Sequence, residues 1–215
     1  MKEFFLNLLD WIYKKKCYFC GKSNECVKMC SKCYETMEHI KPEVNRIVMK
    51  KPVYCAGLYG KNLQKLIRGL KYHNQKDLAK YLARFMWEYW SKLEDKNNFQ
   101  VVPVPIYAKR LKQRKYNHME LVAEEFCRLS GNTLNTDLIK RIKDTKPQYK
   151  LKKAEREVNL SGAFKVNKEN FLPMKILLID DICTTGSTFE EMIKEFEKHN
   201  ISDITCLAAT TPFEE

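Results

Sequence analysis

The sequence predicts an α/β fold with a mainly parallel sheet, preceded by a small cysteine module. One observation is the aliphatic run Ile176-Leu-Leu-Ile179, which leads into two acids and a hydroxyl-rich turn. Another is the helical periodicity that follows this turn. The third is a set of four cysteines near the N-terminus with the spacing C-x2-C-x9-C-x2-C.

The run Ile176–Ile179 is short, unbroken and apolar, which is typical of a strand buried on both faces of a parallel sheet. A buried helix of the same composition would need more room than Pro173 and Gly186 leave. After the glycine, residues 187–198 have apolar side chains at helical spacing, at 189, 192, 193 and 196. The unit is therefore a strand, a turn and a helix.

The turn between this strand and helix has the composition of a phosphate site, because backbone amides at a helix N-terminus attract phosphate. It adds hydroxyl donors and a glycine that lets the backbone approach closely: Thr184, Thr185, Gly186, Ser187 and Thr188. Asp180 and Asp181 stand at the carboxyl end of the strand, where open α/β sheets bind ligands. Since carboxylates repel phosphate, we expect them to accept hydrogen bonds from sugar hydroxyls. The alternative is a capped helix with solvated acids.

The rest of the chain supplies further elements of the same fold class. Periodicity predicts strands at 52–59 and 101–105 and helices at 61–72, 76–93 and 117–130. The second of these strands must stop pairing at its prolines, Pro103 and Pro105. We expect His73 to make a structural hydrogen bond at a helix end.

Basic residues exceed acidic ones: 39 Lys and Arg against 27 Asp and Glu in 215 residues, a formal net charge of +12. This surplus indicates a polyanionic partner, either nucleic acid or phosphorylated small molecules, although a lysine-rich proteome gives the same balance. The run Lys109–Lys115 has no acid and follows the proline-ended strand, so we expect the strand to end in a tight turn, followed by arginines that clasp a pyrophosphate. The alternative is a basic surface loop. A second basic segment, Lys140–Arg156, overlaps the aperiodic stretch 141–160, which should cover a site or be disordered.

The cysteine spacing near the N-terminus is that of a structural zinc site. Four thiolates would complete a tetrahedral Zn²⁺ and leave no open position: Cys17, Cys20, Cys30 and Cys33. Disulfides are the alternative, which a reducing compartment opposes. Cys26 lies between the two pairs and could replace one ligand. The cysteines in apolar surroundings are expected to be inert core residues: Cys55, Cys127 and Cys206.

The first residues fit an amphipathic helix that packs on the protein or on a partner, with apolar side chains at 4, 5, 8, 9 and 12. Glu3 and Asp10, without a small-residue cleavage site, argue against a signal peptide. No apolar stretch approaches the roughly 20 residues that span a membrane, so we expect a cytoplasmic protein. The expected division is 1–50 for the helix and zinc module and 51–215 for the α/β domain.

Several motifs follow one another in a fixed order along the chain: the cysteine module, Leu66-Ile-x-x-Leu-Lys-Tyr72, Val102-Pro-Val-Pro105, Arg114-Lys-Tyr-Asn117, Gln148-x-x-Leu151, Arg156-x-x-Asn159-Leu-x-Gly-Ala-Phe164 and DDICTTGST. The motif around Asp180 by itself resembles the phosphoribosyl-pyrophosphate (PRPP) loop of type I phosphoribosyltransferases. The whole order resembles the ComF family of phosphoribosyltransferase-like proteins, which is associated with DNA uptake in natural transformation. One departure is Lys115, where the family usually has glycine, and Tyr116 replaces a phenylalanine.

The resemblance implies a type I phosphoribosyltransferase core and a role for each motif. Asp180 and Asp181 would hold the ribose hydroxyls, and the loop Thr184–Thr188 would hold the 5′-phosphate. Arg110 and Arg114, with Mg²⁺, would stabilise the leaving pyrophosphate.

Arg156 would close over the site and exclude water. The implied activity is transfer of phosphoribosyl from PRPP to an unknown acceptor. The alternatives are a catalytically silent accessory protein that binds single-stranded DNA and a regulator that senses PRPP. DNA-uptake machinery proteins are further candidate partners.

Overall fold

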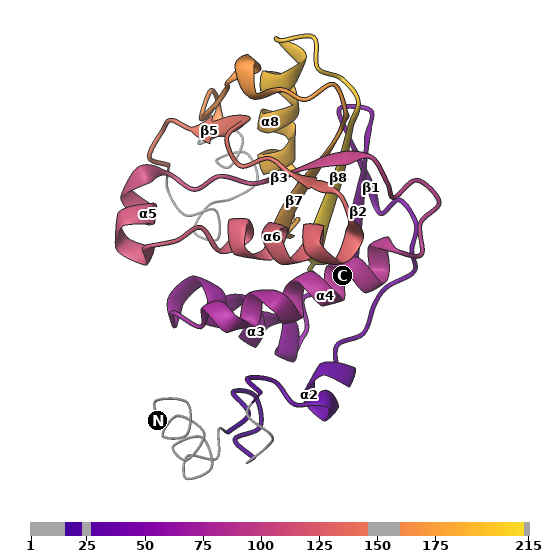
Figure 1. The fold of residues 1–215 in the computed structure, drawn as a ribbon, viewed down its shortest axis with the longest axis vertical. Helices are drawn as coiled ribbons and strands as arrows, with labels where there is room; N and C mark the ends of the chain where they lie inside the picture. The colour runs from indigo at the N-terminus through magenta and orange to yellow at the C-terminus, as the bar shows by residue number, and fades with distance from the viewer. Residues whose placement is uncertain (1–15, 23–26, 146–159, 213–215) are drawn as a thin grey trace, which may run out of the picture.

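A six-stranded sheet forms the centre of the computed structural model, which describes residues 16–22, 27–145 and 160–212. The strand order is β1-β2-β8-β7-β3-β4 (Figure 1). Every neighbouring pair is parallel except β1 with β2, which confirms the predicted α/β class. The strands are β1 (Arg46–Val48), β2 (Lys51–Leu58), β3 (Phe99–Pro103), β4 (Thr133–Leu134), β7 (Lys175–Ile182) and β8 (Ile204–Thr211).

Strand β7 lies inside the sheet, paired with β8 on one side and β3 on the other. Its residues Ile176–Ile179 are completely buried, as the aliphatic run predicts. Successive side chains of a strand point to opposite faces. Leu177 and Ile179 accordingly belong to one hydrophobic core, and Ile176 and Leu178 belong to the other.

Three helices cover the face to which Leu177 and Ile179 point: α3 (Lys61–Tyr72), α4 (Ala79–Trp90) and α6 (His118–Ser130). The helix predicted over 61–72 is confirmed, and the one predicted over 76–93 is divided into the 3-10 turn η1 (Lys76–Leu78) and α4. Helix α6 begins where the Asn117 side chain accepts a hydrogen bond from the Met119 amide, at 3.0 Å. It ends at Gly131, in the left-handed conformation expected of a helix stop.

The opposite face carries helix α8 (Ser187–Glu197) and a two-stranded hairpin of β5 (Ile139–Arg141) with β6 (Phe164–Val166), followed by the 3-10 turn η3 (Lys168–Asn170). Figure 1 shows α8 and β5 on one side of the sheet, and α3, α4 and α6 on the other. The two strands lie on either side of the aperiodic stretch predicted over 141–160 and include only Arg141 of it. Gln148, Leu151 and Arg156 lie outside the described residues.

The basic run after β3 is helical rather than a surface loop. It forms helix α5 (Ala108–Arg114), because Ala, Lys, Arg, Leu and Gln are strong helix formers. The helix ends at Lys115, whose φ of 65° is the left-handed conformation that glycine adopts most easily. Lys115 adopts this conformation at a cost of about 1–2 kcal/mol.

The four-cysteine module lies at the end of the molecule beyond α3, with the short helix α2 (Ser31–Glu35) (Figure 1). The helix predicted for the first 13 residues and Cys26 are outside the described residues. Strand β1 already belongs to the sheet, and the domain division at residue 50 stays a prediction.

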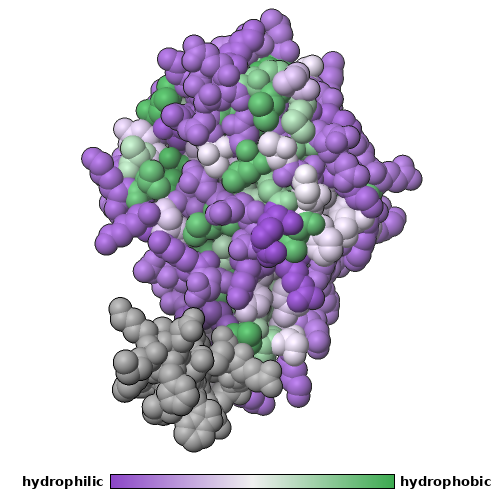
Figure 2. All heavy atoms as spheres, viewed as in Figure 1, coloured by the Kyte–Doolittle hydropathy of each residue, from purple (hydrophilic) through white to green (hydrophobic). Residues whose placement is uncertain are grey.

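The face drawn in Figure 2 is mostly hydrophilic, with hydrophobic residues in small separate groups. In the described part of the chain, no helix has both the length and the hydrophobicity of a membrane span.

Candidate functional site

The turn from β7 into α8 is built around Gly186. Its φ is 86°, a left-handed value, and a Cβ atom at this position would lie 2.7 Å from Cγ2 of Val48. Glycine is therefore required by both conformation and space. The Thr185 and Ser187 hydroxyls are hydrogen-bonded at 2.7 Å. The first amides of α8 have no acceptor within the helix, so the turn offers N–H and O–H donors to an anion.

The two acids before this turn point to opposite faces of the sheet. Asp181 alternates with Asp180 along β7, so it shares a face with Ile179, while Asp180 shares a face with Leu178. Asp181 is only 3% exposed, and Asp180 is half-buried. The two carboxyl groups therefore cannot bind the same ligand group side by side, and each has its own surroundings.

Asp181 is held by two cationic or polar donors from different helices. The Lys71 ammonium, at the end of α3, lies 2.6 Å from Oδ2 of Asp181. Nε2 of His118, the first residue of α6, lies 2.6 Å from the same oxygen. Burial would raise the pKa of Asp181, but the charge of Lys71 and the hydrogen bond from His118 hold it well below its usual range. Asp181 is thus a permanently charged, internally paired group.

His118 connects this carboxylate to Arg114. Nη1 of Arg114 lies 2.8 Å from Nδ1 of His118. A guanidinium has only donors, so Nδ1 accepts, and the ring proton is on Nε2, facing Asp181. Burial lowers the pKa of His118, which agrees with a neutral ring. The Arg114 guanidinium also lies 5.8 Å from the ring centre of Tyr72, whose side chain is 58% exposed.

Asp180 has a different electrostatic environment. Burial and the charge of Asp181 raise the pKa of Asp180 to about 8. On this face, burial and Arg110 lower the pKa of Arg141 to about 10, while the charge of Asp180 opposes this change. Arg141 is at the end of β5 and was not singled out from the sequence.

Arg110 and Arg141 converge on Thr145. Nη2 of Arg110 donates to the Thr145 carbonyl at 2.7 Å, and Nη2 of Arg141 donates to the Thr145 hydroxyl. Nε of Arg141 is buried and has no hydrogen-bond partner, the one such side-chain atom in the described segments. A buried donor without an acceptor is costly, and two adjacent guanidinium groups repel each other. A bound anion would relieve both.

The predicted site residues are therefore brought to one edge of the sheet in two groups. Asp181 and Arg114 are on one face, and Asp180 and Arg110 are on the other. Arg156 is outside the described residues. Sequence reasoning missed Lys71, His118 and Arg141. Lys71 and His118 could have been identified as candidate site residues from the sequence. Each is a polar residue at the end of a predicted helix, and these helix ends lie at the carboxyl edge of the sheet.

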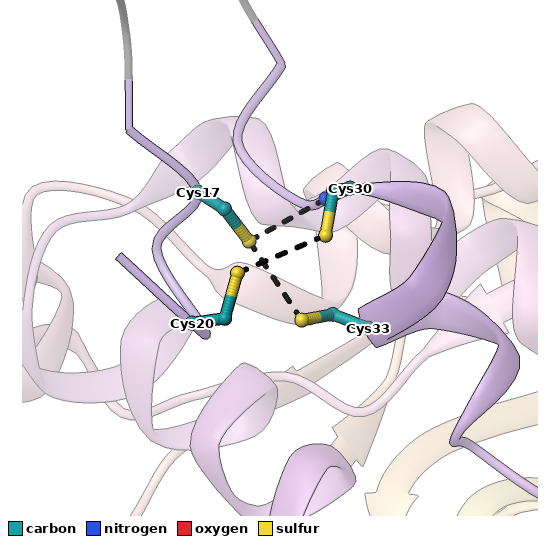
Figure 3. Close-up of side chains that lie close together, drawn as sticks. All are labelled: Cys17, Cys20, Cys30 and Cys33. Atoms are coloured by element: carbon teal, nitrogen blue, oxygen red, sulfur yellow. Dashed lines mark hydrogen bonds between the residues drawn. The ribbon is translucent and has the colours of Figure 1, made fainter. Parts of the chain in front are cut away.

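The four cysteines form one cluster, with all sulfur atoms within 4.8 Å of one another (Figure 3). Cys17 and Cys33 are 3.9 Å apart, and so are Cys20 and Cys30. A tetrahedral zinc with Zn–S bonds of about 2.3 Å requires S–S distances of about 3.8 Å. The Phe19 and Cys30 amides also point to Sγ of Cys17, at 3.4 and 3.5 Å. The cluster can therefore hold a metal ion, and its all-sulfur ligand set fits Zn²⁺.

The fold and these two candidate sites define a class: an α/β protein with a strand–turn–helix unit, rich in hydrogen-bond donors, at the carboxyl edge of its sheet, and an appended four-cysteine module. No family model matches the chain. Among solved structures, an adenine phosphoribosyltransferase from Thermoanaerobacter pseudethanolicus is similar, with a TM-score of 0.36 and 14% identity over 63% of this chain and 82% of that one. The fold class rests on the sheet topology rather than on this match.

Curated relatives define the group more closely. Competence protein F of Haemophilus influenzae is 28% identical over 87% of this chain and 86% of its own length. The DNA utilization protein YhgH of Salmonella typhimurium is 24% identical over 90% of both chains. Competence protein ComFC of Bacillus subtilis is 26% identical over 80% of this chain and 67% of its own length. The chain is a homologue of these proteins, and the resemblance to the ComF family is confirmed.

Proposed function

We propose that this chain is a ComF-type protein that binds PRPP with Mg²⁺ at the β7–α8 turn and takes part in DNA uptake. The observation that carries the proposal is the direct succession, at one sheet edge, of the half-buried carboxyl group of Asp180, a glycine turn with hydroxyl donors, and a helix N-terminus. This order matches the parts of a ribose 5-phosphate: hydroxyls at the carboxylate and phosphate at the turn.

Asp180 is the principal acceptor for the ribose hydroxyls in this proposal. It is half-buried and accepts one hydrogen bond from the Asp181 amide, at 2.8 Å on Oδ1. Asp181 supports it from the other face, since its Oδ2 already has two donors. The loop Thr184–Thr188 would take the 5′-phosphate. Both acids thus keep a role in the site, with different tasks.

The pyrophosphate of PRPP would bind at the pair Arg110 and Arg141. The proposal is supported by the orphaned Nε of Arg141 and by the convergence of both guanidiniums on Thr145. Mg²⁺ bound together with PRPP would neutralise part of the pyrophosphate charge beside Arg110 and Arg141. Arg114 has a supporting role here, because His118 and Tyr72 hold it on the other face.

The part in DNA uptake is supported by the names of the relatives, two of which are competence proteins and one a DNA utilization protein. Helix α5 adds an exposed basic surface beside the site, which suits single-stranded DNA. Transfer of phosphoribosyl to an acceptor is the further step that distinguishes an enzyme from a PRPP-binding accessory protein.

Thermal unfolding with separate parts of the ligand tests the site. PRPP with Mg²⁺ should raise Tm most, ribose 5-phosphate and pyrophosphate should each raise it less, and ribose alone should have no effect. Arg141→Met should abolish the shift with pyrophosphate and keep that with ribose 5-phosphate. If none of the phosphorylated ligands changes Tm, the proposal is wrong. Pyrophosphate release with candidate nucleobases then separates transfer from binding.

A further inference from the structure

Helix α3 contacts the four-cysteine module along one side. At its start, Nδ2 of Asn62 donates to the Cys33 carbonyl at 3.3 Å. One turn later, Nζ of Lys65 donates to the Phe19 carbonyl at 3.0 Å and lies over the Phe19 ring. Cys33 is a candidate metal ligand and Phe19 lies between two others. The first half of α3 is therefore attached to the backbone that carries the thiols.

The last turn of α3 packs on Tyr18, the residue after Cys17. A Cβ atom at Gly69 would lie 3.3 Å from the Tyr18 ring, so the helix backbone approaches this ring directly. The Tyr18 hydroxyl is hydrogen-bonded to Nδ1 of His73 at 2.7 Å. This is the structural hydrogen bond that was expected of His73.

The same turn carries Lys71 toward the ligand site. Lys71 lies between Gly69 and His73, and its ammonium reaches Asp181, 2.6 Å away. Burial alone would lower the pKa of Lys71, but the charges of Asp181 and Asp180 raise it. One helical turn thus contacts the cysteine module on one side and supplies the counter-charge of the carboxylate pair on the other.

We propose that Lys71 is a positioning residue for Asp180 and Asp181, and that the metal-loaded cysteine module sets its position through α3. The inference rests on the proposed function of the β7–α8 turn. Within its described residues, the module has no separate hydrophobic core, because its buried Met29 and Met37 belong to the core formed with α3 and α4. A module without a core of its own depends on its metal for a fixed fold. Metal binding and PRPP binding are then coupled, and coupling between two ligands is reciprocal.

Zinc transfer to a chromogenic chelator, with and without PRPP and Mg²⁺, tests the coupling in the full-length protein. We expect saturating PRPP to slow zinc loss by about fivefold or more, a common size for coupling between sites. The zinc-depleted protein should also bind PRPP more weakly, by the factor by which PRPP raises the equilibrium affinity for zinc, because reciprocity applies to binding affinities. Ribose without phosphate should leave the rate unchanged.

Variants separate positioning from general destabilisation. Lys71→Met should keep its zinc and lose the effect of PRPP on zinc release, while Lys71→Arg should restore part of the effect. Lys61→Met, an exposed lysine at the other end of the same helix, should behave like wild type. Tyr18→Phe removes only the hydroxyl that contacts His73, so it provides a second test if Lys71→Met does not fold.

The outcomes distinguish this inference from the proposed function. If PRPP binds and zinc is released at the same rate with and without it, the coupling is refuted while the PRPP site stands. If Lys71→Met and Tyr18→Phe both keep the full effect, α3 is not the connection and the inference fails. If PRPP does not bind to wild type, both the proposed function and the inference fail.

Discussion

Removing the Lys71 ammonium should destabilise the fold through the charge that it leaves behind. Lys71→Met keeps most of the aliphatic stem but leaves Asp181 charged and 3% exposed. Breaking a buried ion pair by removing one partner costs about 3–5 kcal/mol. Here His118 still donates to Asp181, and the Lys71 side chain is 21% exposed. A hydrogen bond to a charged group is worth about 1.5–3 kcal/mol. We therefore expect a loss of about 2–3 kcal/mol in the free energy of unfolding.

Urea unfolding of wild type, Lys71→Met, Asp181→Asn and the double variant gives this loss of stability. Together the four proteins form a double-mutant cycle that measures the interaction energy between Lys71 and Asp181. Removing both charges should cost less than the sum of the single changes, with a coupling energy of about 1–2 kcal/mol. The matched control is Lys175 with Asp95, also 2.6 Å apart but with side chains 35% and 66% exposed. That pair should show a coupling below about 1 kcal/mol. Equal coupling in the two cycles would refute the argument from burial.

Three further predictions concern the metal, the titration of Asp180 and DNA. Purified protein should contain one Zn²⁺ per chain, and Cys30→Ser should lose it; unchanged zinc content by metal analysis would exclude Cys30 as a ligand. Because the folded pKa of Asp180 is raised to about 8, the folded protein keeps a proton that the unfolded chain releases near pH 4. The free energy of unfolding of wild type, compared with that of Asp180→Asn, should therefore fall as the pH rises from about 5 to 8. If the unfolding free energies of the two proteins change in parallel with pH, the prediction is wrong. Lys109→Ala, Lys112→Ala and Lys115→Gly together should reduce the salt slope of single-stranded DNA binding by about 0.7 per lost phosphate contact. Glycine suits the left-handed backbone at 115, and alanine at the exposed lysines 80, 168 and 198 serves as the charge-matched control. If both triple variants reduce the salt dependence of single-stranded DNA binding by the same amount, α5 is not the DNA-binding surface.

Local sequence patterns were enough to predict the elements that form the site. The aliphatic run before Asp180 could be placed in an interior parallel strand, because a short unbroken apolar run is typical of a strand that is buried on both faces. All four of its residues are buried in the structure. The cysteine spacing likewise predicted the cluster, since two short Cys-x2-Cys hooks can meet at one metal.

The partners of Asp181 could not be predicted from local patterns. His118 and Asp181 are 63 positions apart in the sequence, and their contact depends on how α6 is packed on the sheet. Periodicity shows which helix face is buried but not which residue of another element its end will meet. The different environments of Asp180 and Asp181 also depend on tertiary packing and could not be predicted from local patterns. Strand alternation predicts opposite faces, but the charges on each face are known only from the fold.

The basic run after β3 shows that charge can obscure helix propensity. Its lysines and arginines allowed a basic surface loop as an alternative, whereas the run has high helix propensity and forms α5. Lys115 shows the reverse: a residue that disfavours the left-handed conformation adopts it because Asn117 must begin α6 two residues later. In both cases the surrounding chain decided the conformation.

Calorimetric titration of PRPP with Mg²⁺ tests the central claim, that the β7–α8 turn is a PRPP site. At a pH of about 9, above the pKa of Asp180, wild type should bind, and Asp180→Asn with Asp181→Asn should bind at least about tenfold more weakly, because Asp180→Asn removes a charged acceptor worth about 1.5–3 kcal/mol. Asp180→Asn alone should account for most of the loss at an unchanged circular dichroism spectrum. Binding of PRPP to the folded double variant with wild-type affinity would contradict the account.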